Sequence, residues 1–109
     1  MANTFKLKTK ANVGVTTVGI YTAPAATTTV VIGITLSNTS GSGVNVGVGI
    51  TRAGTTEDVK LLKNAPIPQG SSLEFMAGNK VVLETTDTLT VDSDTNSSVD
   101  AALTIMEIT

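Results

Sequence analysis

The chain has 109 residues, a formal net charge of -2 and 15% charged residues, and it contains no Cys, His or Trp. A chain of this length has room for one modest core, so we expect a single domain over residues 1–109. The missing Cys and His exclude disulfides, thiolate nucleophiles and the commonest general base and metal ligand. Seven basic against nine acidic residues provide no strongly basic surface, and the sequence therefore predicts no nucleic-acid partner.

The hydropathy pattern predicts neither secretion nor membrane insertion. The first six residues, MANTFK, lack the apolar run of a signal peptide. No stretch approaches the ~18 unbroken apolar residues of a membrane span. We therefore expect a protein made in the cytoplasm without secretion, with no membrane partner.

The β-branched residues dominate the composition, with 20 Thr, 13 Val and 7 Ile. Branching at Cβ suits pleated strands and disfavours helices. The ten glycines lie in clusters such as 41–43, which are typical of turns. The composition therefore predicts an all-β protein.

Residues 4–10 alternate strictly, which predicts a half-buried strand with Phe5 and Leu7 toward the core. The opposite face carries three lysines: Lys6, Lys8 and Lys10. One interpretation is that these lysines protect an edge strand from pairing with another molecule. The other is that they form a contact row for an acidic surface on a partner.

Three further strands are predicted over 17–22, 28–38 and 44–51. The last two are expected to form a hairpin with the Gly-rich tip 39–43. Their expected apolar faces are Val30, Ile32, Ile34 and Leu36 on one strand and Val44, Val46, Val48 and Ile50 on the other. The opposite face of 44–51 carries Asn45, Gly47 and Gly49. Two bare glycines suggest that something packs close to this face, and all three residues are candidate partner contacts.

The second half of the chain predicts a short strand over 59–63 and a proline-rich corner over 64–70. A second hairpin is expected from 71–76 and 80–84, around a turn at Gly78-Asn79, with Leu73 and Phe75 inward. Strands over 88–92 and 99–108 complete the set, the last as a central strand with Val99, Ala101, Leu103 and Ile105 on one face.

Eight or nine short strands separated by turns fit a single small β-sandwich. The pattern is compatible with a jelly roll and with an immunoglobulin-like topology, and it does not decide between them. We expect two of the three aromatic residues to lie in the core.

An acidic segment near the end of the chain copies part of a calcium loop. Its candidate ligands are Asp92, Asp94, Asn96 and Asp100. The sixth position, which should be Gly, is Ser97, and the twelfth, which should be a bidentate Glu, is Leu103. An acidic turn that bonds its own backbone explains the same residues. We therefore expect no metal and no cofactor, and keep calcium as the secondary hypothesis.

The sequence offers no catalytic constellation. The serines have no His base, and the acids show no spacing that unites a pair. After Gly41-Ser42-Gly43 the third glycine of a dinucleotide fingerprint would fall at Val46. With so few aromatic residues, a sugar or single-strand platform is not expected either. We predict a protein that is not an enzyme and has no small-molecule substrate.

Several scaffold segments occur together in an order that carries a resemblance. They are Thr22-Ala23-Pro24 before a Val/Ile-rich strand ending at Asn38, the corner 66–74 (PIPQGSSLE), Lys80-Val81-Val82-Leu83-Glu84, Ser98-Val99-Asp100 and Glu107-Ile108. This pattern resembles small β-sandwich structural proteins from the virions of tailed bacteriophages, and it covers nearly the whole chain. The resemblance implies an adhesive virion component without catalytic residues.

Within that class we expect a capsid decoration or cement protein that binds the major capsid protein lattice and stabilises the head. A neck, collar or tail-associated protein is the first alternative, with neck or tail proteins as partners. A carbohydrate-binding or adhesin domain that contacts the host surface is the second alternative. A homo-oligomer is expected because a small sandwich with a modest core gains stability by association.

Overall fold

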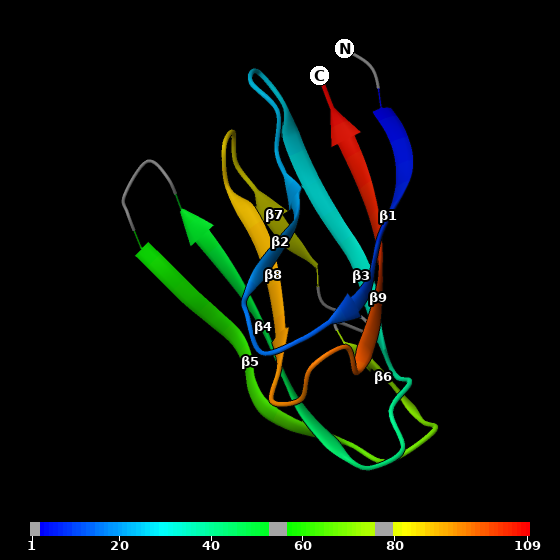
Figure 1. The fold of residues 1–109 in the computed structure, drawn as a ribbon. Coiled ribbons are helices and arrows are strands. Elements are labelled where there is room, and N and C mark those ends of the chain that lie inside the picture. The colour runs from blue at the N-terminus through cyan, green and yellow to red at the C-terminus, as the bar shows by residue number, and fades with distance from the viewer. Residues whose placement is uncertain (1–2, 53–56, 76–79) are drawn as a thin grey trace.

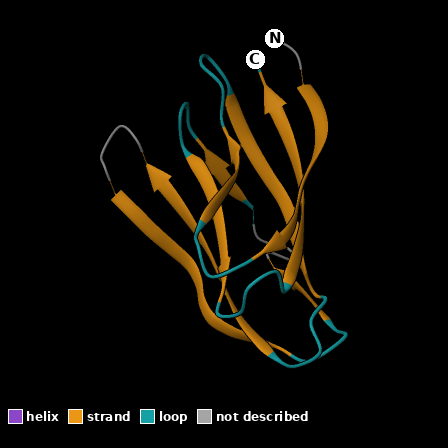
Figure 2. Cartoon of the chain, viewed as in Figure 1, coloured by secondary structure: helices purple, strands orange, loops and turns teal. Residues whose placement is uncertain are grey.

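The computed structural model describes residues 3–52, 57–75 and 80–109, without the side chain of Phe75. Every regular element in these residues is a strand, and nine strands form two antiparallel sheets (Figures 1 and 2). This confirms the all-β sandwich that the β-branched composition predicts. The described residues contain no helix with the length and apolarity that crossing a membrane requires.

The two sheets differ in size. The five-stranded sheet contains β1 (Asn3–Val13), β9 (Val99–Ile108), β3 (Thr28–Asn38), β6 (Ser72–Phe75) and β7 (Val81–Leu83). In it β9 lies between β1 and β3, and β6 and β7 pair with different parts of β3. The four-stranded sheet contains β2 (Val18–Thr22), β8 (Thr88–Ser93), β4 (Val44–Arg52) and β5 (Glu57–Ile67), side by side in that order.

The strand pairing decides the topology. Because β6 and β7 follow one another along the same edge of β3, they count as one interrupted strand. The chain then pairs its first strand with its last, β2 with β8, β3 with β6 and β7, and β4 with β5. Such nested pairs form one long antiparallel ribbon wound into two sheets, which is a jelly roll. Of the two topologies left open by the sequence, the structure selects this one.

Both predicted hairpins are wrong. The strands β3 and β4 lie in opposite sheets, because the segment between them crosses from one sheet to the other (Figure 1). The Asn38 side chain fixes this crossing by donating from Nδ2 to the carbonyls of Ser42 (2.8 Å) and Ile67 (2.9 Å). The strands β6 and β7 pair with β3 and not with each other. The predicted Gly78-Asn79 turn lies outside the described residues.

The predicted apolar faces of β4 and β9 are confirmed, and all eight of their side chains are buried. On β3 the prediction holds only for Ile34 and Leu36. The register shifts between Val31 and Gly33, and this irregularity changes the face on which the following residues lie. As a result Val31 is buried, whereas Val30 and Ile32 are half-buried.

The orientation predicted for β1 is also wrong. The side chains of Phe5 and Leu7 are 68% and 65% exposed. Phe5 lies opposite Met106, and Lys6 lies opposite the buried Ile105. Since directly opposite residues of an antiparallel pair share a face, the lysines lie on the inner side and the apolar pair on the outer side.

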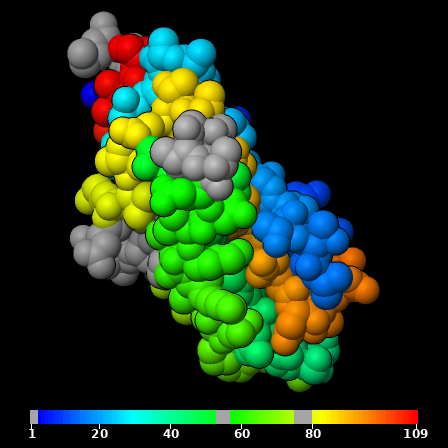
Figure 3. All heavy atoms as spheres, turned by 90° about the vertical axis from the view of Figure 1, so that its left-hand side faces the viewer, coloured from blue at the N-terminus to red at the C-terminus, as the bar shows by residue number. Residues whose placement is uncertain are grey.

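The strand predicted over 59–63 is longer than expected. It forms β5, which extends from Glu57 to Ile67 and includes Pro66. Proline is tolerated because β5 is an edge strand. Two register shifts against β4 absorb extra residues of β5, and Asn64 adopts a positive φ of 53°. The strand therefore bends around β4 and follows its whole length, as the green band in Figure 3 shows.

Candidate functional site

The lysine row of β1 lies on the inner side of an edge strand. Lys6, Lys8 and Lys10 are directly opposite Ile105, Leu103 and Ala101, which all face the core. Within the described residues β1 pairs with β9 alone, so its other edge is open (Figure 1). Charged side chains turned inward at an open edge hinder strand addition. The geometry agrees with the protective interpretation of the row and leaves its contact with a partner a prediction.

The ammonium group of Lys6 belongs to a buried polar network that connects both sheets. Its Nζ lies 2.9 Å from Glu107 Oε1, and Tyr21 Oη donates to Glu107 Oε2 at 2.6 Å. A further hydrogen bond of 2.7 Å joins Tyr21 Oη to Thr29 Oγ1. Tyr21 belongs to the four-stranded sheet, and the other three members of the network belong to the five-stranded sheet. The network therefore links the sheets across the sandwich.

The network changes the titration of both of its acidic groups. Burial, and then the hydrogen bond to the Glu107 carboxylate, raise the pKa of Tyr21 from 10.0 to about 12. The hydrogen bonds from Tyr21 and Lys6 lower the pKa of Glu107. Sequence analysis missed this network, because it placed Lys6 in solvent and gave Glu107 no partner.

Lys8 and Lys10 differ from Lys6. Neither forms an ion pair with any residue that the structure describes. Lys10 is exposed and Lys8 is half-buried. These two ammonium groups are the cations of the row that are available to an acidic partner.

The outer face of the five-stranded sheet, defined here by the outward residues of its paired positions, carries an exposed apolar row. Phe5, Met106, Val30 and Val82 lie directly opposite one another across β1, β9, β3 and β7. Two of them, Phe5 and Val82, are more than half exposed. Leu7 begins the next row, which continues through Thr104 to Gly33.

Small side chains follow along the same face. The third row joins Thr9, Ala102 and Thr35, and beside it the outer face is hollowed by a cavity of about 260 Å³. The only charged residues at the paired positions of the outer face are Glu74, on the edge strand β6, and Asp100, at the start of β9. A sheet face without central charges is unusual for a solvated surface and is typical of an interface core.

The two glycines predicted as partner contacts are covered by their own chain. A Cβ on Gly47 would lie 2.6 Å from Asp92 Oδ1, and one on Gly49 would lie 2.9 Å from the carbonyl oxygen of Val59. The close packing expected at the glycine face therefore comes from β5 and β8. Asn45 is exposed. A partner contact by these three residues stays a prediction.

The calcium candidates use their oxygens within the chain. Asp92 accepts from Thr17 Oγ1 at 3.0 Å, Asp94 from the Asn45 amide at 3.1 Å, and Asp100 from the Asn12 amide at 3.0 Å. The fourth candidate, Asn96, is exposed in the turn between β8 and β9. Among the residues that the structure describes, no three acidic side chains converge as metal ligands. These contacts favour the interpretation as an acidic turn.

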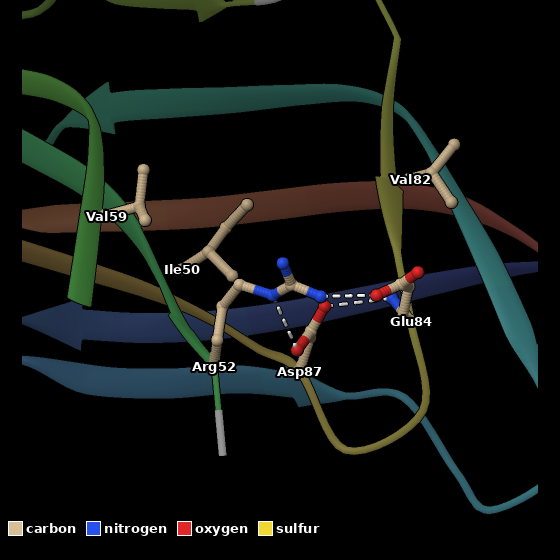
Figure 4. Close-up of a pocket in the computed structure, with 6 residues that line it drawn as sticks. All are labelled: Ile50, Arg52, Val59, Val82, Glu84 and Asp87. Carbon is tan, nitrogen blue, oxygen red and sulfur yellow. Dashed lines mark hydrogen bonds and ion pairs between the residues drawn. The ribbon is translucent and has the colours of Figure 1, made fainter. Parts of the chain in front are cut away.

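An open cleft of about 410 Å³ lies between the sheets, with Ile50 and Val59 on one side and Val82 on the other (Figure 4). At its end Arg52 Nε lies 3.3 Å from Asp87 Oδ1, and Arg52 Nη2 pairs with Glu84 Oε1. Asp87 Oδ2 also accepts from the Glu84 amide at 2.9 Å. The cation is thus already paired with two acids, and its role here is to join β4 to the β7–β8 turn.

The fold and its surfaces define a small jelly-roll domain whose outer face carries no charge at its central paired positions. No family model matches the sequence, and no curated protein aligns with it significantly. Several solved structures are similar to this chain, and two of them illustrate the shared fold. One comes from Bacillus endospore appendages, described as disulfide-linked pili, with a TM-score of 0.57, 16% identity, and coverage of 99% of this chain and 87% of that one. The other is infectious bursal disease virus, Gx strain, with a TM-score of 0.51 and 12% identity, covering 95% of this chain and 32% of the viral chain.

Proposed function

We propose that this chain is a non-enzymatic structural protein of a phage virion, and within that class a capsid decoration protein. The observation that carries the proposal is the outer face, with an apolar row and no charge at its central paired positions, on a jelly-roll fold shared with a pilus and a virus. Jelly rolls also occur in lectins and cupins, so this part of the argument is an analogy of fold. The absence of His from the sequence disfavours a cupin metal site. The sequence has only three aromatic residues, and this small number disfavours the aromatic platform of a lectin.

The proposed partner is the major capsid protein, and the proposed contacts start from the lysine row. Lys8 and Lys10 present cations at the open edge of the sandwich and would face an acidic surface of the capsid lattice. Asn45 adds an exposed amide on the opposite sheet. Each contact is weak, but many copies on one particle act together.

The copy number of the protein in purified particles tests the placement. We expect a ratio on the order of one copy per capsid subunit, or one per local threefold axis, because only a lattice offers so many equivalent sites. Quantitative mass spectrometry with labelled peptide standards measures this ratio against the major capsid protein. About a dozen copies per particle would instead place the protein in the neck or tail, where rings fix the count.

A charge reversal tests the proposed contact row. The double variant Lys8→Glu, Lys10→Glu should be depleted from particles, because two attractive contacts become repulsive. We do not include Lys6, since it pairs with the buried Glu107. The matched control is Lys60→Glu, Lys63→Glu on β5, which makes the same change of charge on the other sheet. Equal incorporation of both double variants would contradict the role of β1.

A further inference from the structure

The outer face of the five-stranded sheet combines a raised part and a hollow part, and the cavity at the hollow part is also bordered by Lys10, Ser37 and Asp100. The raised part is the apolar row of Phe5, Met106 and Val30, and the hollow part is the row of Thr9, Ala102 and Thr35 beside the cavity of about 260 Å³. The Leu7 row lies midway between them, and Leu7 is 65% exposed. A rotation of a second copy by two-fold symmetry about this middle row places each raised row over the hollow row of the other copy.

We propose that two copies of this chain pack face to face through this outer face. The two-fold axis crosses the strands at the Leu7 row, so that Leu7 of one copy contacts Leu7 of its partner. Phe5 and Met106 of each copy then fill the hollow beside Ala102 of the other copy. The proposal goes beyond the proposed function, because it concerns the isolated chain and makes no use of a particle.

The charge distribution supports a second copy as the occupant. Pairing a surface with itself brings like charges together, and this costs free energy wherever the surface is charged. Here the paired positions carry charge only at the rim, at Glu74 and Asp100. Lys6 and Lys8 lie on the inner side, whereas Lys10 borders the cavity of the outer face together with Asp100, a residue of opposite charge. The outer face is therefore compatible with its own copy.

The size of the face is comparable with that of a small interface. Five cross-strand rows on β1, β9 and β3 cover about 34 Å by 14 Å, roughly 490 Å² in projection, and β6 and β7 add to this area where they pair with β3. Side-chain relief adds to the accessible area, and a standard interface buries about 800 Å² per partner. Two aligned sheets that pack through apolar faces form the same kind of layer as the sandwich interior.

Sedimentation velocity of the purified chain over a range of micromolar concentrations tests the dimer. We expect a reversible species of twice the 11.1 kDa chain mass. Leu7→Asp should raise the dissociation constant by at least about 100-fold, because it sets two carboxylates against each other at the axis. The matched control is Val15→Asp, which changes an exposed valine between β1 and β2 and should leave the constant within about 3-fold. A monomeric wild type, or a dimeric Leu7→Asp, would overturn the proposal.

A variant that fills the hollow distinguishes this specific packing from a non-specific apolar association. Ala102→Leu adds apolar area to the outer face, but it occupies the space that Phe5 and Met106 of the second copy fill in the proposed dimer. We expect it to weaken the dimer by at least about 10-fold, with an unchanged circular dichroism spectrum that shows the fold is kept. Stronger association of Ala102→Leu would show a merely apolar contact and would overturn the proposed register.

Discussion

Tyr21 joins the two sheets through a single oxygen atom. Its phenol reaches Glu107 and Thr29 in the opposite sheet, and Glu107 in turn holds Lys6 on the edge strand β1. Buried polar groups with full sets of partners fix one arrangement of the elements around them. The described residues contain no buried side-chain nitrogen or oxygen without a hydrogen bond, so the network is satisfied.

The titration of Tyr21 is a direct test of this network. The chain has one Tyr and no Trp, and phenolate absorbance therefore reports on this side chain alone. We expect a midpoint at about pH 12 in the folded protein and near 10.0 in concentrated urea. Because the fold favours the neutral phenol, its contribution to stability is complete below about pH 10 and is lost as the pH rises to about 12. A folded midpoint near 10.0 would contradict the network.

A variant separates the two causes of this pKa shift. Glu107→Gln removes the negative charge but keeps the burial of the phenol. The folded midpoint should therefore fall and still remain above 10.0, since burial is the larger cause.

The pairing of β4 with β5 depends on two glycines. The bends of β5 bring the carbonyl oxygen of Val59 within 2.9 Å of a Cβ placed on Gly49, and that of Leu62 within 3.3 Å of a Cβ placed on Gly47. Glycine here permits close approach of a neighbouring backbone, and no positive φ is involved. The alternation of β4 thus serves both sides of the strand, with large side chains toward the core and glycines outward at the two positions where β5 approaches most closely.

Gly49→Ala should destabilise the protein by about 1–3 kcal/mol, because the new methyl group would lie 2.9 Å from a backbone oxygen and β5 would have to move. The control is Gly43→Ala, whose methyl group would lie 3.8 Å from its nearest atom and should cost nothing measurable. Urea unfolding of both variants gives the two free energies. Equal stabilities would show that β5 adapts without cost.

At the scale of the whole molecule, the five-stranded sheet carries apolar side chains on both of its faces. The interior is formed by inward residues of both sheets, among them Leu103 on the central strand β9. The exterior apolar row lies on the other side of the same sheet. Part of this second apolar surface is left exposed in a single copy, which is why we connect it with association.

Two leucines distinguish the two surfaces. Leu103→Ala should lower the free energy of unfolding by about 2–5 kcal/mol, because Leu103 is 0% exposed and its loss leaves a cavity. Leu7→Ala should change it by less than about 0.5 kcal/mol at a dilution where the chain is monomeric. Chemical denaturation at low protein concentration measures both values. A large loss of unfolding free energy for Leu7→Ala would instead support the predicted orientation, with Leu7 toward the core.

The sequence by itself determined the fold class and most of the core. Branched residues and alternation located strands at or near all nine observed positions, and the inner faces of β4 and β9 followed from period two. Alternation indicates that the two faces of a strand differ in polarity, but it does not indicate which face is buried. On β1 the buried face depends on the pairing with β9. At this edge position Lys6 lies on the inner face and Phe5 on the outer face, the reverse of the predicted orientation.

Only the tertiary structure decided the topology and the surfaces. Neighbouring strands such as β3 and β4 looked like a hairpin, but jelly-roll winding places them in opposite sheets. The outer row unites Phe5, Val30, Val82 and Met106, which stand far apart in the sequence and meet only through register. Register is a long-range property, because bulges and the burial of one face across several strands set it. A local sequence pattern therefore cannot predict it.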